Sequence, residues 1–182
     1  VIIGVRKGVN MKAIQFNQQQ VEAYKNGATM FVVPIQEGIF IHNGTVTFDN
    51  KTKCWSKSDY IEAFFPLQIG DEFFIQEDFA KWGRRIFYRA DNTTSDSFLH
   101  MVGSKWQEAS QMQEHQSRFT DLNCVNVEVK RVQDIWHNEY ALMGKPIITH
   151  DKYFRKSFNE QFDVNYDKNP CVFLITSRGK GN

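Results

Sequence analysis

The sequence has few cysteines, few prolines and no excess of charge of either sign. Among its 182 residues there are three cysteines and four prolines, and the net charge is +1. Cys54, Cys124 and Cys171 lie far apart and form no C-x-x-C pair, which argues against a disulfide framework and against a structural zinc site. Three widely spaced cysteines fit a reducing compartment, so we expect a cytoplasmic protein.

Sequence patterns for common cofactors and partners are also missing. The five histidines are scattered outside any H-E-x-x-H motif, and no G-x-G-x-x-G, P-loop or G-x-S-x-G sequence occurs. We therefore expect no metal and no cofactor. No stretch approaches the roughly 20 apolar residues of a membrane-spanning helix. The balanced charge gives no global basic field that would attract nucleic acid or a membrane.

What the chain has instead is aromatic residues, which make up 14% of it and include sixteen phenylalanines. Aromatic side chains bury large areas and so predict a β-rich core; the alternative is a surface on which nucleic-acid bases stack. The length suits one domain, which we place at residues 11–177. We expect residues 1–10 to be a non-native or disordered leader before Met11, because residues 6–10 could be translated from a ribosome-binding sequence. Residues 178–182 are predicted to be a flexible tail.

The first elements are predicted by local signals. Asn17, followed three residues later by Gln20, forms a capping box for a helix that ends at Gly27. Residues 29–33 are an apolar run without charge, which predicts a buried strand ended by Pro34. These signals place a short helix directly before a strand.

Further elements follow at short intervals. Residues 39–48 carry Asn-Gly at their centre, a strong signal for a β-hairpin with a type I′ turn. Residues 124–130 alternate, so Val125, Val127 and Val129 are predicted to share one face. Further strands are predicted at 72–76, 85–89 and 171–176, and loops at 49–58 and 92–97. Helices are predicted at 104–116, at 133–143 and after Asp151. The last of these helices has Phe154, Phe158 and Phe162 on one face.

Interleaved strands and short helices predict an α+β fold. We expect a small, strongly bent mixed or antiparallel sheet or barrel with short peripheral helices, because turns separate the elements at close spacing. No repeat at a fixed period is visible.

Six stretches between Met11 and Ile175 follow one pattern in order. They are Met-Lys-Ala-Ile-Gln-Phe-Asn at 11–17, a segment with Gly-Asp at 67–79, Tyr-Arg-Ala-Asp at 88–91, Met112 with Ser117 and Arg118, the strand end at 129–135, and Asn-Pro-Cys-Val-Phe at 169–173. Together they resemble the phage-type ASCH proteins, a branch of the PUA-like superfamily. The resemblance implies a single ASCH/PUA-like domain, built on a small β-barrel with a ligand cleft beside it.

The resemblance also implies where a catalytic site would lie. Some ASCH amidohydrolases act on N4-acylated cytidine with a lysine and a threonine after the first helix and a later glutamate. At these positions this chain has Thr29, Val32 and Met143. Valine has no hydroxyl to act as nucleophile, threonine has no positive charge, and methionine cannot act as a general acid or base. The resemblance therefore implies a catalytic site that has been filled with core residues.

Glu77, Ser117 and Arg118 are ligand-binding candidates, because the resemblance places them near the barrel mouth and its cleft. The alternative is a structural role, in an ion pair or in contacts at the ends of strands, since partly buried carboxylate–arginine pairs are commonly structural.

A basic strand that carries an aromatic residue provides the other candidates, namely Arg84, Arg85, Tyr88 and Arg89. Contact with phosphates combined with base stacking needs such residues. An exposed strand edge that charge protects from pairing needs them equally, so both interpretations stay open.

Three functions remain open. The leading one is a non-enzymatic PUA-like binding domain, from a phage or prophage, that admits RNA or a modified nucleoside to a cleft beside the barrel. The first alternative is an amidohydrolase on N4-acylated cytidine-like substrates with rearranged residues, for which Thr29 and Glu77 are the only candidate pair. The second alternative is a protein–protein interaction module with an exposed aromatic patch.

Overall fold

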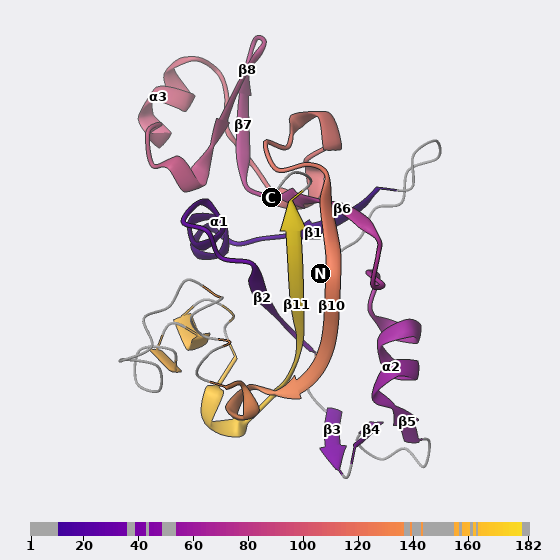
Figure 1. Ribbon diagram of the computed structural model, residues 1–182. Coiled ribbons are helices and arrows are strands. Elements are labelled where there is room, and N and C mark those ends of the chain that lie inside the picture. Colours follow the sequence, from indigo (N-terminus) through magenta and orange to yellow (C-terminus); the bar gives the residue numbers. More distant parts are fainter. Residues whose placement is uncertain are drawn as a thin grey trace.

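The computed structural model describes residues 11–35, 39–42, 44–48, 54–136, 139, 143, 155–156, 158–160, 162 and 164–179. Its largest sheet has five strands, in the spatial order β1 (Lys12–Gln15), β6 (Glu72–Gln76), β10 (Leu122–Arg131), β11 (Cys171–Gly179) and β2 (Met30–Pro34). β1 and β6 are parallel, and the other neighbouring pairs are antiparallel. Figure 1 shows β10 and β11 side by side through the middle of the fold.

Two smaller sheets lie at opposite ends of the main sheet (Figure 1). One has the order β3 (Ile39–His42), β4 (Thr45–Phe48), β5 (Cys54–Ser56), and the other has the order β8 (Arg85–Tyr88), β7 (Phe79–Trp82), β9 (Trp106–Gln107). Mixed strands with short helices confirm the predicted α+β class. Among the described strands no closed barrel is found, because β1 and β2 are the two edges of the five-stranded sheet.

The first helix, α1 (Gln18–Lys25), forms where the capping signal predicts it. The Asn17 side chain accepts a hydrogen bond from the backbone N–H of Gln20 at 3.0 Å, and the Gln20 side chain accepts one from the backbone N–H of Asn17 at 3.1 Å. Gly27 follows the helix with φ of +90°, a left-handed conformation that favours glycine and stops the helix. The capping box is therefore confirmed.

Two helices were not predicted. α2 (Lys57–Phe64) begins at a Ser56 cap, and together with β5 it replaces most of the described part of the loop predicted at 49–58. α3 (Asp96–Met101) begins at a Ser95 cap within the turn predicted at 92–97. The loop predictions are wrong there because helices of eight and six residues are too short to show a clear apolar period.

Most strand predictions are confirmed, with small shifts at their ends. β6 has the predicted bounds, and β3 and β4 pair as the predicted hairpin. β2 includes Pro34, which an edge strand tolerates. β11 is longer than the predicted 171–176, because Arg178 and Gly179 continue the pairing with β10. Both residues fall within the tail predicted at 178–182.

The helix predicted at 104–116 is wrong. This segment contains β9 and two short 3₁₀ turns, Ala109–Gln111 and Glu114–Gln116, whose backbone bonds span single turns. In the segment predicted as a helix at 133–143, the described part begins with the 3₁₀ turn Val132–Asp134. The leader 1–10, Asn43 of the predicted turn, the predicted cap Asp151, Phe154 and Lys180 lie outside the described residues.

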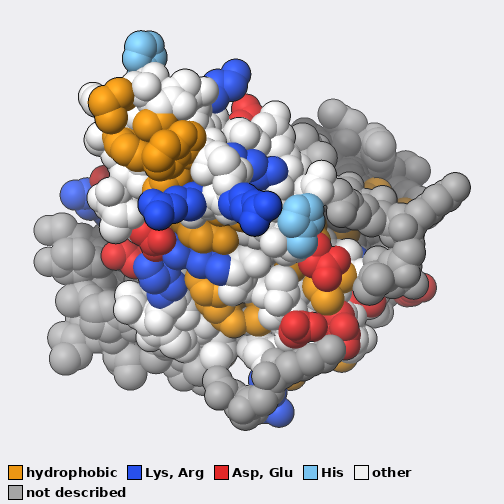
Figure 2. All heavy atoms as spheres, turned by 90° about the horizontal axis from the view of Figure 1, so that it is seen from above, with side chains coloured by type: hydrophobic (Ala, Val, Ile, Leu, Met, Phe, Trp, Pro, Cys, Tyr) orange, Lys and Arg blue, Asp and Glu red, His pale blue; other side chains and the backbone are white. Residues whose placement is uncertain are grey.

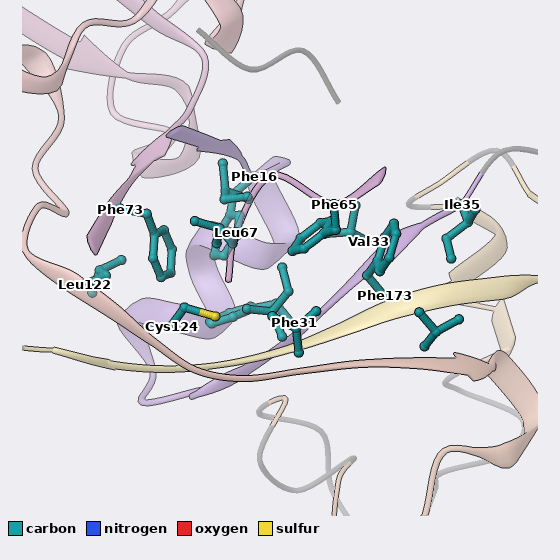
Figure 3. Packing of buried hydrophobic residues seen from close by; sticks show 14 of the residues in the cluster. Phe16, Phe31, Val33, Ile35, Phe65, Leu67, Phe73, Leu122, Cys124 and Phe173 are labelled. Atoms are coloured by element: carbon teal, nitrogen blue, oxygen red, sulfur yellow. The ribbon is translucent and has the colours of Figure 1, made fainter. Parts of the chain in front are cut away.

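Phenylalanines build the core between the main sheet and the helices, as Figure 3 shows. Phe65 and Phe173 lie 4.2 Å apart between ring centroids, and Phe16 and Phe31 lie 4.5 Å apart. A second cluster packs on the other residues of β2 and β11 and includes Met30, Val32, Val172, Leu174 and Phe158. β2 is therefore buried on both faces, which explains why its sequence is a bare apolar run.

The alternation predicted for 124–130 is broken by a β-bulge. The register between β10 and β11 shifts between Cys124 and Asn126. As a result Cys124 is buried in the same cluster as Val127 and Val129, whereas Val125 is 42% exposed. A bulge inserts one extra residue into a strand and so reverses the face on which earlier residues lie. The prediction that all three valines share one face is wrong for Val125.

A matched pair of substitutions tests this bulge. Val127→Ala removes a buried side chain and is expected to lower the free energy of unfolding by about 2 kcal/mol. Val125→Ala, on the exposed side, is expected to change it by less than about 0.5 kcal/mol. Urea denaturation of both variants measures the difference. Equal losses would mean that the two valines share one face after all.

Candidate functional site

The candidate site lies where β1 and β6 end. Because these strands are parallel, Phe16 and Asn17, which follow β1, lie at the same sheet edge as Glu77 and Asp78, which follow β6. The 3₁₀ turn Arg89–Asp91, which follows β8, joins them there, since the backbone N–H of Arg89 donates to the Asp78 carbonyl at 3.0 Å. Three segments distant in sequence thus meet at one place.

Glu77 is the most deeply buried acidic residue described at this edge, with 1% of its surface exposed. Arg118 donates to both of its carboxylate oxygens, from Nε at 2.9 Å and from Nη2 at 2.8 Å. Paired parallel hydrogen bonds of this kind are the strongest that a carboxylate makes with a cationic side chain. The structure therefore brings together two of the three candidates that the resemblance named.

Arg118 also connects Glu77 to the surface. Its Nη1 donates to both carboxylate oxygens of Asp91, at 2.7 and 2.8 Å, and Lys25 donates to the same carboxylate at 2.8 Å. The guanidinium lies 4.2 Å from the ring centroid of Tyr88, and the Tyr88 hydroxyl donates to the Gln116 carbonyl at 2.8 Å. Two carboxylates and two cations thus form a chain of contacts, which we call the Glu77–Arg118 network.

The network shifts pKa values in opposite directions. Burial raises the pKa of Glu77 above its ordinary value, and the hydrogen bonds and charge of Arg118 oppose that rise. Burial also acts to raise the pKa of Asp91, but the hydrogen bonds from Lys25 and Arg118 outweigh it and leave that pKa lowered. Folding therefore favours the ionised form of Asp91.

Ser117, the third candidate, is used by the backbone. Its hydroxyl donates to the Ile75 carbonyl at 2.7 Å and accepts from the Phe119 N–H at 3.1 Å. These are contacts at the end of β6, the structural role that the sequence analysis left open. These hydrogen bonds hold the segment that contains Arg118 against β6, the strand that directly precedes Glu77.

A cavity of about 340 Å³ opens beside the network. Its walls come from the end of β1 and the start of α1, from β2, from the loop after β6, and from the two 3₁₀ turns that begin at Arg89 and Ala109. The lining residues are Gln15, Phe16, Asn17, Gln18, Gln20, Val32, Val33, Pro34, Glu77, Asp78, Arg89, Ala90, Ala109 and Phe162. Apolar and amide side chains dominate, and the charged groups lie to one side.

The positions that the resemblance linked to catalysis separate in space. Val32 lines the cavity, but Thr29 and Met143 are not among its lining residues. Thr29 is exposed before β2, where its carbonyl accepts a hydrogen bond from the Ser177 N–H at 2.8 Å. Met143 is buried in the second core cluster. The cavity therefore contains Glu77 but not the threonine nominated beside it.

The basic candidates fall into two places. Arg89 lines the cavity, and its guanidinium lies 3.7 Å from the Asp78 carboxylate. Tyr88 belongs to the Glu77–Arg118 network. Arg84 and Arg85 lie at the exposed end of the β7–β8 hairpin.

Sequence reasoning missed the roles of Asp91, Lys25 and Asp78. Asp91 stands inside the Tyr-Arg-Ala-Asp stretch, so that motif was the signal for it. Asp78 accepts a hydrogen bond from the Ala109 N–H at 3.0 Å, a contact across thirty-one positions that no local pattern shows. A buried glutamate, Glu139, was missed as well; it accepts hydrogen bonds from Lys130 and from the Trp136 N–H, apart from the cavity.

Within the described ranges, no group of three or more histidine, cysteine, aspartate or glutamate side chains is placed to hold a metal ion. In the same part of the chain no helix is long and apolar enough to cross a membrane. Compared with protein-family models, with curated proteins and with solved structures, the chain gives no match. The resemblance to phage-type ASCH proteins therefore stays a prediction from the sequence.

Removing Arg118 is expected to destabilise the protein strongly. Arg118→Ala leaves the Glu77 carboxylate, with 2% of its side chain exposed, buried without its partner, and we expect a loss of about 3–5 kcal/mol in unfolding free energy. Lys25→Ala removes the exposed end of the network, where the lysine side chain is 41% exposed, and should cost at most about 1 kcal/mol. Chemical denaturation at neutral pH compares the two. A loss for Arg118→Ala no larger than that for Lys25→Ala would contradict this role of the buried pair.

The lowered pKa of Asp91 predicts a stability change in acid. A folded-state pKa below the unfolded value of about 3.9 means that the folded protein binds fewer protons at this site. Its stabilisation is then complete above that unfolded value and is lost as the pH falls through the folded pKa. The difference in unfolding free energy between wild type and Asp91→Asn should therefore shrink from neutral pH to about pH 3. Glu22→Gln, on the exposed side of α1, is the control; a constant difference for Asp91→Asn would refute the prediction.

Proposed function

We propose that this chain is a non-enzymatic binding domain of phage or prophage type, and that its cavity holds a modified nucleoside or a single RNA base. The proposal includes a PUA-like architecture, in which the bent five-stranded sheet and the two small sheets correspond to the barrel and its extensions. The observation that carries the proposal is the cavity beside Glu77, because of its size and its lining.

The size of the cavity suits a nucleoside. Ligand pockets of this kind hold about 300–1,000 Å³ and combine apolar walls with a few polar groups that fix orientation. Here the partly buried Pro34 and Phe162 offer apolar contact, and the amides of Gln15 and Gln18 carry both donors and acceptors of hydrogen bonds, with the Gln18 nitrogen donating to Asn92 at 3.0 Å. A base needs the same combination, with apolar contact on its faces and hydrogen bonds along its edge.

The chemistry of the lining supports binding over hydrolysis. Both oxygens of Glu77 accept hydrogen bonds from Arg118, so the carboxylate is held as part of a structural pair. A general base must lie within hydrogen-bond reach of the nucleophile that it activates. The cavity wall at β2 consists of Val32, Val33 and Pro34, none of which is a nucleophile. The alternative, an amidohydrolase with rearranged residues, would need a nucleophile delivered to this wall.

Filling the cavity tests the proposal. Ala90→Leu adds bulk at a lining residue of the 3₁₀ turn, and we expect it to weaken nucleoside binding at least about tenfold through steric exclusion. Ala63→Leu, on the exposed side of α2, is the matched control and should leave binding unchanged. Isothermal titration of cytidine, N4-acetylcytidine and 5-methylcytidine with the three proteins gives the affinities.

Three outcomes would overturn the proposal. Release of acetate from N4-acetylcytidine by the wild-type protein would establish the hydrolase alternative. If the wild-type protein bound none of the nucleosides and no short single-stranded RNA, the proposed ligand of the cavity would be wrong. Binding that survives Ala90→Leu unchanged would place the nucleoside elsewhere on the protein.

A further inference from the structure

The β7–β8 hairpin extends outward from the cavity. β7 begins directly after Asp78 and β8 ends directly before Arg89, and both of these residues line the cavity. From Arg89 to Arg85 the strand covers about 13 Å, at about 3.3 Å for each residue. Figure 1 shows the hairpin standing out at one end of the fold, next to α3.

One face of this hairpin is aromatic. Trp82 pairs with Arg85, and Ala80 pairs with both Phe87 and Trp106, so these side chains lie on the same face. The ring of Phe98 in α3 lies 5.9 Å from the rings of both Trp82 and Phe87, which fixes their positions. Trp82 keeps 43% of its surface exposed. A tryptophan held in place and still open to solvent provides a flat surface for stacking.

The same hairpin carries cations that have no carboxylate partner among the described residues. Lys81, Arg84 and Arg85 are exposed, and among the described residues none of the three has an ion pair. This contrasts with the Glu77–Arg118 network beside the cavity, where Arg118 and Lys25 pair with Glu77 and Asp91. Figure 2 shows the result at this end of the molecule, where orange hydrophobic side chains lie beside blue lysine and arginine side chains.

We propose that the β7–β8 hairpin binds the strand of single-stranded RNA that leads to the base held in the cavity. In this arrangement Arg84 and Arg85 contact phosphates, and a neighbouring base stacks on Trp82. The proposal rests on the function proposed above and names the ligand more closely: the nucleoside is presented within a polynucleotide. The cavity selects the base, and the hairpin supplies affinity that does not depend on sequence.

The chemistry favours RNA over a protein partner. Arginine matches phosphate with paired hydrogen bonds, and an exposed tryptophan beside such an arginine gives the combination that binds single strands. An apolar protein surface placed on Trp82 would also bury Arg85, its cross-strand neighbour, which is costly unless that surface carries matching carboxylates. Ribose also fits the amide-rich cavity, because its 2′-hydroxyl both donates and accepts hydrogen bonds as Gln15 and Gln18 do.

Fluorescence anisotropy with a labelled RNA of about ten nucleotides that contains one N4-acetylcytidine tests this inference. Wild-type protein should bind this RNA more tightly than the free nucleoside and more tightly than the DNA of the same sequence. Trp82→Ala is expected to weaken RNA binding about tenfold or more. Arg84→Ala/Arg85→Ala should lower the slope of log affinity against log salt by about 1.4, since each phosphate contact contributes about 0.7 for single strands.

Matched controls come from other segments. Trp136→Ala removes another exposed tryptophan, with 72% of its surface exposed, and Arg155→Ala/Lys156→Ala removes another exposed pair of cations. Both should bind the RNA as wild type does. All hairpin variants should keep wild-type affinity for the free nucleoside, and thermal melts confirm that they fold.

The outcomes separate this inference from the proposed function. Nucleoside binding combined with RNA affinity that neither hairpin variant reduces would overturn the inference and leave the cavity function standing. Failure of wild type to bind the nucleoside in either form would overturn both. Equal affinity for DNA would refute recognition of the ribose 2′-hydroxyl in the cavity, and with it the choice of RNA. If Trp82→Ala reduced RNA binding but Arg84→Ala/Arg85→Ala changed neither the affinity nor the salt slope, the assignment of phosphate contacts to the two arginines would be wrong.

Discussion

Much of the candidate site depends on one requirement, that the buried carboxylate of Glu77 needs a partner. An ionised carboxylate inside a protein is stable only when it is paired and hydrogen-bonded. Arg118 meets this requirement with two hydrogen bonds, and its remaining nitrogen reaches Asp91. Three segments must therefore arrive together: the end of β6, the 3₁₀ turn after β8 and the segment before β10. The cavity lies between the first two of these segments and β2.

The apolar run of β2 has a consequence for chemistry as well as for folding. Alternate residues of β2 belong to two separate core clusters, with Phe31 and Val33 in one and Met30 and Val32 in the other. A strand packed on both faces cannot present a polar reactive side chain without leaving a gap in one cluster. The part of β2 that borders the cavity therefore carries no reactive side chain.

The sequence predicted features that depend on neighbouring residues and missed those that depend on distant ones. The capping box at Asn17 and the bounds of β6 follow from a few adjacent side chains. The bulge at Cys124 depends on the register with β11, and the partners of Glu77 lie 41 positions away at Arg118 and, through it, at Asp91. The resemblance named Glu77 and Arg118 as neighbours of a cleft without showing that they bind each other. Only the fold decides whether such a pair is free for a ligand.

The distribution of charge differs between the two surfaces to which we assign recognition. In the Glu77–Arg118 network two carboxylates face two cations, so its field largely cancels at the cavity. The exposed cations at the end of the β7–β8 hairpin have no such compensation among the described residues, and in the proposed arrangement they attract an anionic strand before any base reaches the cavity. Salt should therefore weaken the capture of a polynucleotide while it leaves the affinity for a neutral nucleoside almost unchanged. A net charge of +1 conceals this separation, because it averages a neutral pocket with a basic hairpin.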